Sequence, residues 1–246
     1  MMLSYTAAIP TRDRPEELRR ALGHILEQKP VPEKIIIVDD GNLDRTELAG
    51  WLGEDSGKLI YHKKDRPGLV RSLNKAVDLC PTPWILLLDD DIYLDSDFMS
   101  RMTAAIESHT HPERLAGLAG YIVLPEKMRN GFRRRLRLFM ERLFLLNGGI
   151  EGRFLSSGYC CDYGGCGHVP AHPYSVEHVP GGLGLWRADI LRQYHFDEHY
   201  LGYAYGNDKD LAYRVSREWD LVCQPASKAL HDKSPLSRVN NYQLGK

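Results

Sequence analysis

The sequence predicts an α/β fold in which helices cover a mostly parallel central sheet. Short runs of aliphatic and β-branched residues alternate with segments of helical periodicity through the first half of the 246 residues. Two of the runs, IIIV at 35–38 and WILLL at 84–88, are almost continuously apolar, as strands buried on both faces are. Because right-handed crossovers place helices on both faces of a sheet, this strand and helix rhythm favours a parallel arrangement.

The expected elements of the first half follow in a regular order. A strand at 3–10 leads into a helix at 15–28, in which Pro15 suits the first turn. The next expected elements are a strand at 34–40, a helix at 45–52, a strand at 58–63, a helix at 69–79, a strand at 84–90 and a helix at about 96–108.

The second half of the chain is less regular. We expect a strand at 115–125, a basic and apolar segment at 132–146, a Gly-, Cys- and His-rich loop up to Pro173, order again at 175–191, a helix at about 208–218 and a strand near 221–224. No internal repeat or low-complexity linker divides the chain, so we expect one domain over 1–246. The final SRVNNYQLGK is typical of the middle of a polar helix or tail, which fits a native chain that continues beyond Lys246.

Composition argues against several classes of protein. Lys and Arg number 32 against 33 Asp and Glu, and the formal net charge of -1 gives no sign of a nucleic-acid partner. Five cysteines, an odd number without a regular framework, predict a reducing, cytoplasmic location. The N-terminus lacks the features of a signal peptide, and no apolar run approaches the roughly 20 residues of a membrane span, so we expect no bilayer crossing.

Acidic residues follow two of the predicted strands. Asp39 and Asp40 come after IIIV, and Asp89, Asp90 and Asp91 come after WILLL. Ligands of parallel α/β sheets bind beyond the carboxyl ends of the strands, so both clusters are expected on one edge. Strand alternation points Asp89 and Asp91 to the same side and Asp90 away. Such a D-x-D pair of oxygen ligands suits Mg²⁺ or Mn²⁺.

The acids after WILLL have two other interpretations. In the first, they cap the next helix, as Asp95 and Ser96 are expected to do. The alternating acids from Asp89 onward also resemble a calcium loop of the EF-hand type. That interpretation fails, because Leu94 stands where the loop needs Gly and Ser100 stands where it needs Glu.

Four motifs occur in one order along the chain: IPTRDRPEELRRAL at 9–22, IIIVDDG at 35–41, GLVRSLNKAV at 68–77 and LLLDDDIYLDSDF at 86–98. Together they make the sequence resemble a family 2 glycosyltransferase of the GT-A fold over essentially its whole length. The resemblance implies inverting transfer by direct displacement at the anomeric carbon of a nucleoside-diphosphate sugar, in cell-envelope polysaccharide or glycolipid synthesis. It also implies a nucleotide-sugar-binding half at about 1–110 and an acceptor and catalytic-base half at about 111–246.

The same resemblance assigns residues to the donor and the metal. The nucleotide-sugar-binding residues that it implies are Pro10, Thr11, Arg12, Asp39, Asp40, Arg71, Asn74, Asp89 and Asp90. Either Asp39 or Asp40 would bind the base of a UDP, dTDP or GDP donor. Asp91, Asp89 and His231 would hold Mn²⁺ or Mg²⁺, although a lone histidine is also a common structural residue. The metal would stabilise the charge that grows on the departing diphosphate.

Transfer also needs a base for the acceptor hydroxyl, which is expected from a glycan or a lipid-linked sugar. YGNDKDLAYRV at 205–215 resembles the family's acidic pair at a helix start, so Asp208 is the predicted base and Asp210 its rival. Asn207 replaces the first acid of that pair, which puts the acceptor-orienting role of this position in doubt. Simple capping of the helix is the alternative role for both aspartates.

PGGLGLWRADIL at 180–191 resembles the acceptor-side segment of the family. Gly181 and Gly182 would let the backbone approach the sugar, or would simply form a turn. Trp186 would stack on a sugar face or lie in the core.

Two further segments have functional interpretations. Cys160, Cys161 and Cys166 share a loop with two histidines, which is enough for zinc, although the spacing is poor; the alternative is a Gly-rich acceptor loop that orders with substrate. Segment 131–146 combines five arginines with Phe and Leu at helical spacing. It predicts peripheral contact with an anionic membrane surface or, alternatively, a helix packed on the domain.

Two other functions compete with glycosyl transfer. A sugar-nucleotidylyltransferase has a similar order of strands and metal carboxylates, but it needs a Gly-rich phosphate loop that AAIPTRDRP does not provide. A non-catalytic nucleotide-sugar or glycan-binding module would explain Asn207. Asp208 and the D-x-D sequence argue against such a module.

Overall fold

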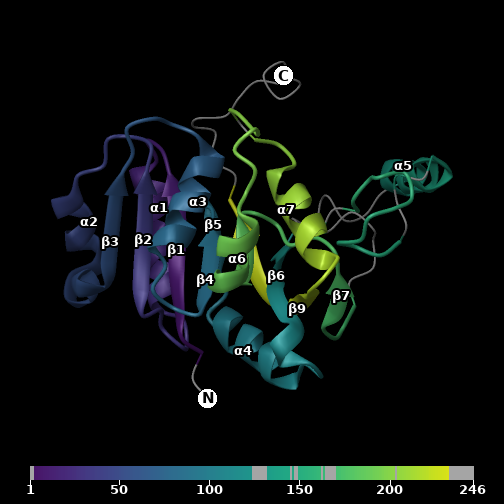
Figure 1. Ribbon diagram of the computed structural model, residues 1–246, viewed down its shortest axis with the longest axis horizontal. Helices are drawn as coiled ribbons and strands as arrows, with labels where there is room; N and C mark the ends of the chain where they lie inside the picture. The colour runs from purple at the N-terminus through teal and green to yellow at the C-terminus, as the bar shows by residue number, and fades with distance from the viewer. Residues whose placement is uncertain are drawn as a thin grey trace.

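One sheet of nine strands runs through the computed structural model, which describes residues 3–123, 132–144, 146, 149–161, 163, 170–202 and 204–232. The strands are β1 (Tyr5–Thr11), β2 (Lys34–Asp39), β3 (Leu59–Lys63), β4 (Trp84–Leu88), β5 (Ile92–Leu94), β6 (Leu115–Val123), β7 (Tyr174–Val176), β8 (Leu183–Arg187) and β9 (Asp220–His231). Their order is β3-β2-β1-β4-β8-β6-β9-β5, with β7 paired to β9 (Figure 1).

The parallel sheet expected from the sequence is confirmed in the first half. Strands β3, β2, β1 and β4 run parallel to one another. Beyond β4 the sheet is mixed, because β8 is antiparallel to both β4 and β6 whereas β6 and β9 are parallel. The carboxyl ends of β1, β2 and β4 therefore share one edge, where the acidic clusters lie.

Helices cover both faces of the sheet. The covering helices are α1 (Pro15–Leu26), α2 (Arg45–Leu52), α3 (Leu69–Leu79), α4 (Phe98–Ser108), α6 (Ala188–Tyr194) and α7 (Asn207–Ser216), whereas α5 (Phe132–Leu143) stands apart from the sheet (Figure 1). Strand alternation divides the core between the two faces. Ile35 and Ile37 pack with α1, α2 and α4, whereas Ile36 and Val38 pack with α3, α6 and α7. These buried layers hold the strand ends in place.

Helix α4 corrects one detail of the prediction. It begins at Phe98 after Asp97, whose side chain makes no capping hydrogen bond. Asp95 and Ser96 therefore do not cap it. The reason is that a further strand, β5, follows the three aspartates directly and precedes the helix.

Strand β5 also determines which residues meet at the sheet edge. It pairs antiparallel with β9, and this register places Ile92 opposite His231. The predicted strand near 221–224 is thus the beginning of the longer β9, whose register against β6 shifts between Cys223 and Lys228. Pro225, which lacks a backbone N–H, lies in this irregular part. The continuation of β9 brings His231 beside Asp91.

Candidate active site

The three consecutive aspartates after β4 have different partners. Asp90 is buried and accepts hydrogen bonds from the Thr11 hydroxyl at 2.7 Å and from Arg14 Nη1 at 2.9 Å. Asp91 faces His231, with 3.1 Å between Oδ1 and Nε2, and its Oδ2 lies 3.6 Å from Arg14. Asp90 therefore ties the end of β1 to the end of β4, and Asp91 belongs to a second group of side chains.

The Asp91 carboxylate and the His231 imidazole are suitable ligands for a divalent cation that further ligands help to hold. Within the described residues, no group of three or more His, Cys, Asp or Glu side chains is arranged to hold a metal ion by itself. A carboxylate and an imidazole nonetheless converge at 3.1 Å. Mg²⁺ in nucleotide enzymes is commonly bound by one or two carboxylates together with substrate phosphates. The two side chains would thus supply part of a coordination shell that a diphosphate completes.

Asp89 lies where negative charge accumulates. Burial, followed by the charges of Asp91 and Asp90, raises the pKa of Asp89 to about 7. Its backbone N–H donates to the carbonyl of Gly182 at 3.0 Å. A positive charge bound at this edge would favour the ionised form of Asp89. The accumulation of carboxylates is therefore suited to a cation.

A second pair of side chains lies at the Pro-Gly-Gly turn before β8. Asp208, in the first turn of α7, accepts hydrogen bonds at Oδ2 from His178 Nε2 and from the N–H of Gly181, both at 3.1 Å. His178 is only 4% exposed, so it contacts Asp208 from the protein interior. The turn residues Gly181 and Gly182 thus connect Asp208 with Asp89.

The surroundings of Asp208 keep it ionised. Burial acts to raise its pKa, but the hydrogen bond and charge interaction with His178 and the N–H groups of Gly181 and Lys209 act against burial. The net result is a pKa below the ordinary value of an aspartate. A carboxylate of this kind is ready to accept a hydrogen bond or a proton from a hydroxyl group.

The neighbours of Asp208 on α7 have structural partners. Asp210 accepts two hydrogen bonds from Arg214, at 3.0 and 2.9 Å, and Arg214 also donates to the Tyr194 and His195 carbonyls. Asn207 is buried and donates to the Ala204 carbonyl at 2.6 Å. Of the two predicted base candidates, Asp210 is therefore the one that pairs with a guanidinium group, and Asp208 has no such partner among the described residues.

The two acids after β2 are held by donors from the chain itself. Asp39 is fully buried and accepts from the N–H groups of Gly41 and Leu43 and from the Tyr61 hydroxyl. Asp40 accepts from the N–H of Gly68 at 2.9 Å and pairs with Lys64 at 2.8 Å. Recognition of a base by either acid stays a prediction.

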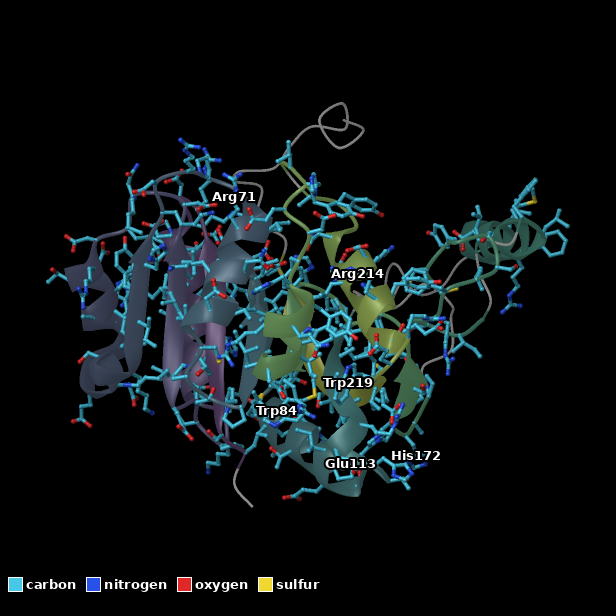
Figure 2. The ribbon with its side chains drawn as sticks, viewed as in Figure 1. Arg71, Trp84, Glu113, His172, Arg214 and Trp219 are labelled. Carbon is cyan, nitrogen blue, oxygen red and sulfur yellow. The ribbon has the colours of Figure 1, made fainter. Side chains whose placement is uncertain are left out.

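The remaining residues predicted for the donor lie close to the same edge. Pro10 and Thr11 end β1, and Arg12 follows with an exposed side chain. Figure 2 shows Arg71 at the upper edge of the molecule, and its Nε lies 3.4 Å from a Glu198 carboxylate oxygen.

Asn74 has a different environment. Its amide exchanges hydrogen bonds with the backbone of Phe196, at 3.0 and 2.9 Å, and thereby connects α3 to the segment after α6.

Trp186, Cys160 and Cys161, which were predicted near the acceptor, are all buried. The Trp186 ring is 1% exposed and packs in the core, so its expected stacking on a sugar face is corrected. The reason is the alternation of β8, which directs this side chain to a helix-covered face. Cys160 and Cys161 are buried, and Cys166 lies outside the described residues.

Sequence reasoning missed His178 and Arg14. Each contacts an acid far away in the chain, Asp208 and Asp90 respectively. The sequence signals are weak: a histidine shortly before a Gly-Gly turn, and a basic residue in the loop after the first strand.

We expect Gly182→Ala to disrupt the site. A Cβ at this position would lie 2.2 Å from Asp89 Oδ2, so the carboxylate must move. Overpacking of this kind costs about 1–3 kcal/mol of unfolding free energy. Chemical denaturation measures this loss. Gly23→Ala is the matched control, because nothing lies within 4 Å of its added Cβ on α1. This helical substitution should stabilise the chain by about 0.5–1 kcal/mol.

Sequence comparison identifies relatives of this chain. The family model "Glycosyl transferase family 2" matches residues 6–149, more than half of the sequence. A PGL/p-HBAD biosynthesis glycosyltransferase of Mycobacterium bovis is 29% identical over 117 residues, which are 46% of this chain and 45% of that protein. A poly-beta-1,6-N-acetyl-D-glucosamine synthase of Staphylococcus aureus is 26% identical over 106 residues, 43% of this chain and 25% of that protein. The matches span less than half of either relative.

Solved structures share the fold over nearly the whole chain. GalNAc-T7 with UDP, GalNAc and Mn²⁺ superposes with a TM-score of 0.66 at 14% identity, covering 94% of this chain and 44% of that one. The mannosyltransferase PcManGT from Pyrobaculum calidifontis, in complex with GDP-Man and Mn²⁺, gives 0.62 at 14% identity, covering 96% and 59%. The likeness confirms the GT-A fold. With the family match over residues 6–149, it follows that this chain belongs to glycosyl transferase family 2.

Proposed function

We propose that this chain transfers a sugar from a nucleoside-diphosphate sugar to an acceptor hydroxyl, with inversion at the anomeric carbon and with the help of Mn²⁺ or Mg²⁺. The observation that carries the proposal is that two side-chain pairs lie near one turn. Gly181 donates its N–H to Asp208, which also contacts His178. Gly182 accepts from the N–H of Asp89, two residues before Asp91, which faces His231.

Each pair has a different task in this proposal. Asp91 and His231 would hold the cation against the donor diphosphate, where a bound divalent ion neutralises the charge of the leaving group. Asp208 would accept the proton of the acceptor hydroxyl, and its depressed pKa keeps it unprotonated before the reaction. His178 would orient the Asp208 carboxylate through the hydrogen bond that it donates. One base and one leaving group on opposite sides of the sugar lead to inversion.

The relatives support the class of substrate. The two solved neighbours were determined with UDP and GalNAc or in complex with GDP-Man, and the Staphylococcus aureus relative is named as the synthase of a polymer. We therefore propose that this chain uses a UDP, dTDP or GDP sugar as donor and a glycan or lipid-linked sugar as acceptor. The reaction would belong to cell-envelope polysaccharide or glycolipid synthesis. A cytoplasmic location stays part of the proposal.

A panel of nucleotide-sugars tests the donor proposal. Each donor is added with Mn²⁺, and the melting temperature and the release of nucleoside diphosphate are measured. A ligand that binds only the native state raises its stability. We expect one donor to give both stabilisation and release. Stabilisation without release under all conditions would support the non-catalytic binding module instead, and the absence of both would contradict the proposal.

His178 is expected to set the pH dependence of transfer. Loss of its hydrogen bond in His178→Phe should raise the pKa of Asp208, because that bond lowers it now. A base works only when deprotonated, so activity should disappear at a higher pH as the solution is acidified. The acidic limb of the pH profile of kcat/KM measures this shift. His178→Gln keeps a side-chain N–H donor and should restore part of the profile. An equal loss at every pH in both variants would indicate a merely structural role.

A further inference from the structure

Helix α5 carries an exposed apolar face. Leu136, Phe139, Met140, Leu143 and the following Phe144 are spaced i, i+3, i+4, i+7 and i+8, so they lie on one side of the helix. All five are between 40% and 63% exposed. By contrast, the apolar face of α3 is buried against the sheet. Figure 1 shows α5 set apart from the sheet and from the helices that cover it.

This apolar surface is concentrated in one region. Seven of the thirteen exposed large hydrophobic residues in the described part of the chain lie between 136 and 150. The alternative of an amphipathic helix packed on the domain does not fit this exposure. An exposed patch of this kind marks a surface that another partner covers.

The net charge of α5 indicates which kind of partner would cover its apolar face. Its sequence contains five arginines and one glutamate, a net charge of +4, in a chain whose total is -1. A second copy of the chain docked symmetrically on this face would bring two such cationic helices together, which is unfavourable. An anionic lipid surface provides both apolar chains and negative headgroups. No helix among the described residues is long and apolar enough to span a bilayer.

The segment that follows α5 reaches the candidate active site. The carbonyl of Gly152 accepts hydrogen bonds from the N–H groups of Glu177 and His178, at 2.7 and 3.0 Å. His178 in turn contacts Asp208. A helix held at a membrane would therefore lie a short stretch of chain from the proposed base.

We propose that α5 binds the interface of an anionic bilayer through Leu136, Phe139, Met140, Leu143 and Phe144, and that the net positive charge of its sequence favours anionic headgroups. The membrane contact is independent of the proposed transferase activity. A lipid-linked acceptor that approaches Asp208 from the bilayer rests on that activity as well.

Flotation of the full chain with vesicles tests the contact. Vesicles of phosphatidylcholine containing phosphatidylglycerol are compared with vesicles of phosphatidylcholine alone. We expect preferential binding to the anionic vesicles, weakened by added salt. Phe139→Glu and Leu143→Glu should each lower this binding about tenfold, because a charge enters the apolar face. Leu201→Glu is the control, since Leu201 is 76% exposed outside α5 and its substitution should leave binding unchanged.

Three results would overturn the membrane contact. They are no binding of the wild type to anionic vesicles, wild-type binding by both α5 variants, or a dimer in solution that Phe139→Glu converts to a monomer. Release of nucleoside diphosphate is measured on the same samples without vesicles. Retained release with failed vesicle binding rejects the contact alone, whereas vesicle binding without release for any donor rejects the transferase proposal alone.

Discussion

Asp208→Asn is expected to lower kcat by roughly 10²- to 10⁴-fold, the usual contribution of a positioned general base. The amide can still accept a hydrogen bond from Gly181, but it cannot take a proton. Donor binding should remain close to that of the wild type, because the Asp91 and His231 pair is untouched. Turnover from nucleoside diphosphate release and donor affinity from calorimetry check the two parts of this result.

Asp210→Asn is the matched control on the same helical turn. It breaks the ion pair with Arg214, so a small loss of stability is expected while turnover is kept. If Asp208→Asn turns over normally and Asp210→Asn does not, the base has been assigned to the wrong residue.

Asp91→Ala is expected to abolish metal-dependent donor binding. The substitution removes the carboxylate that faces His231, leaving one protein ligand of the pair. In the wild type, a donor present at roughly 100 times its Kd stabilises the native state by about 2.7 kcal/mol. Thermal unfolding with donor and Mn²⁺ should show this stabilisation in the wild type and none in the variant. Treatment of the wild type with a chelator should reproduce the loss.

Asp90→Asn tests whether the carboxylate next to Asp91 has a structural role and takes no part in metal binding. Its oxygens accept hydrogen bonds from Thr11 and Arg14, so the expected effect is a loss of about 1.5–3 kcal/mol of stability, as for hydrogen bonds to charged groups. Metal-dependent donor binding should survive at temperatures where the variant is folded. Equal loss of donor binding in both variants would contradict the division of roles between Asp90 and Asp91.

The first half of the fold was predictable because its signals are local. Apolar runs and helical periodicity identified β1 to β4, and α2 and α3 have the bounds that the sequence predicts. Strands β5 and β7 were missed because each has only three residues. The extension of β9 beyond Gln224 was missed because Pro225 ends the regular pattern there, whereas pairing with β5 and β6 continues the strand.

The candidate site was predictable where a motif carries the chemistry. Asp89, Asp91 and Asp208 stand in motifs whose order and spacing resemble a known family. His178 and Arg14 have no such motif, since their roles arise from contacts across the tertiary structure. Of the two roles predicted for Trp186, the core position is confirmed, because the alternation of β8 directs the ring to a helix-covered face.

The anomeric configuration of the first product tests the central claim most directly, and proton NMR of the sugar released or transferred from the donor measures it. Direct displacement with Asp208 as the single base predicts a configuration opposite to that of the sugar in the donor. Retention of the donor configuration would contradict this account.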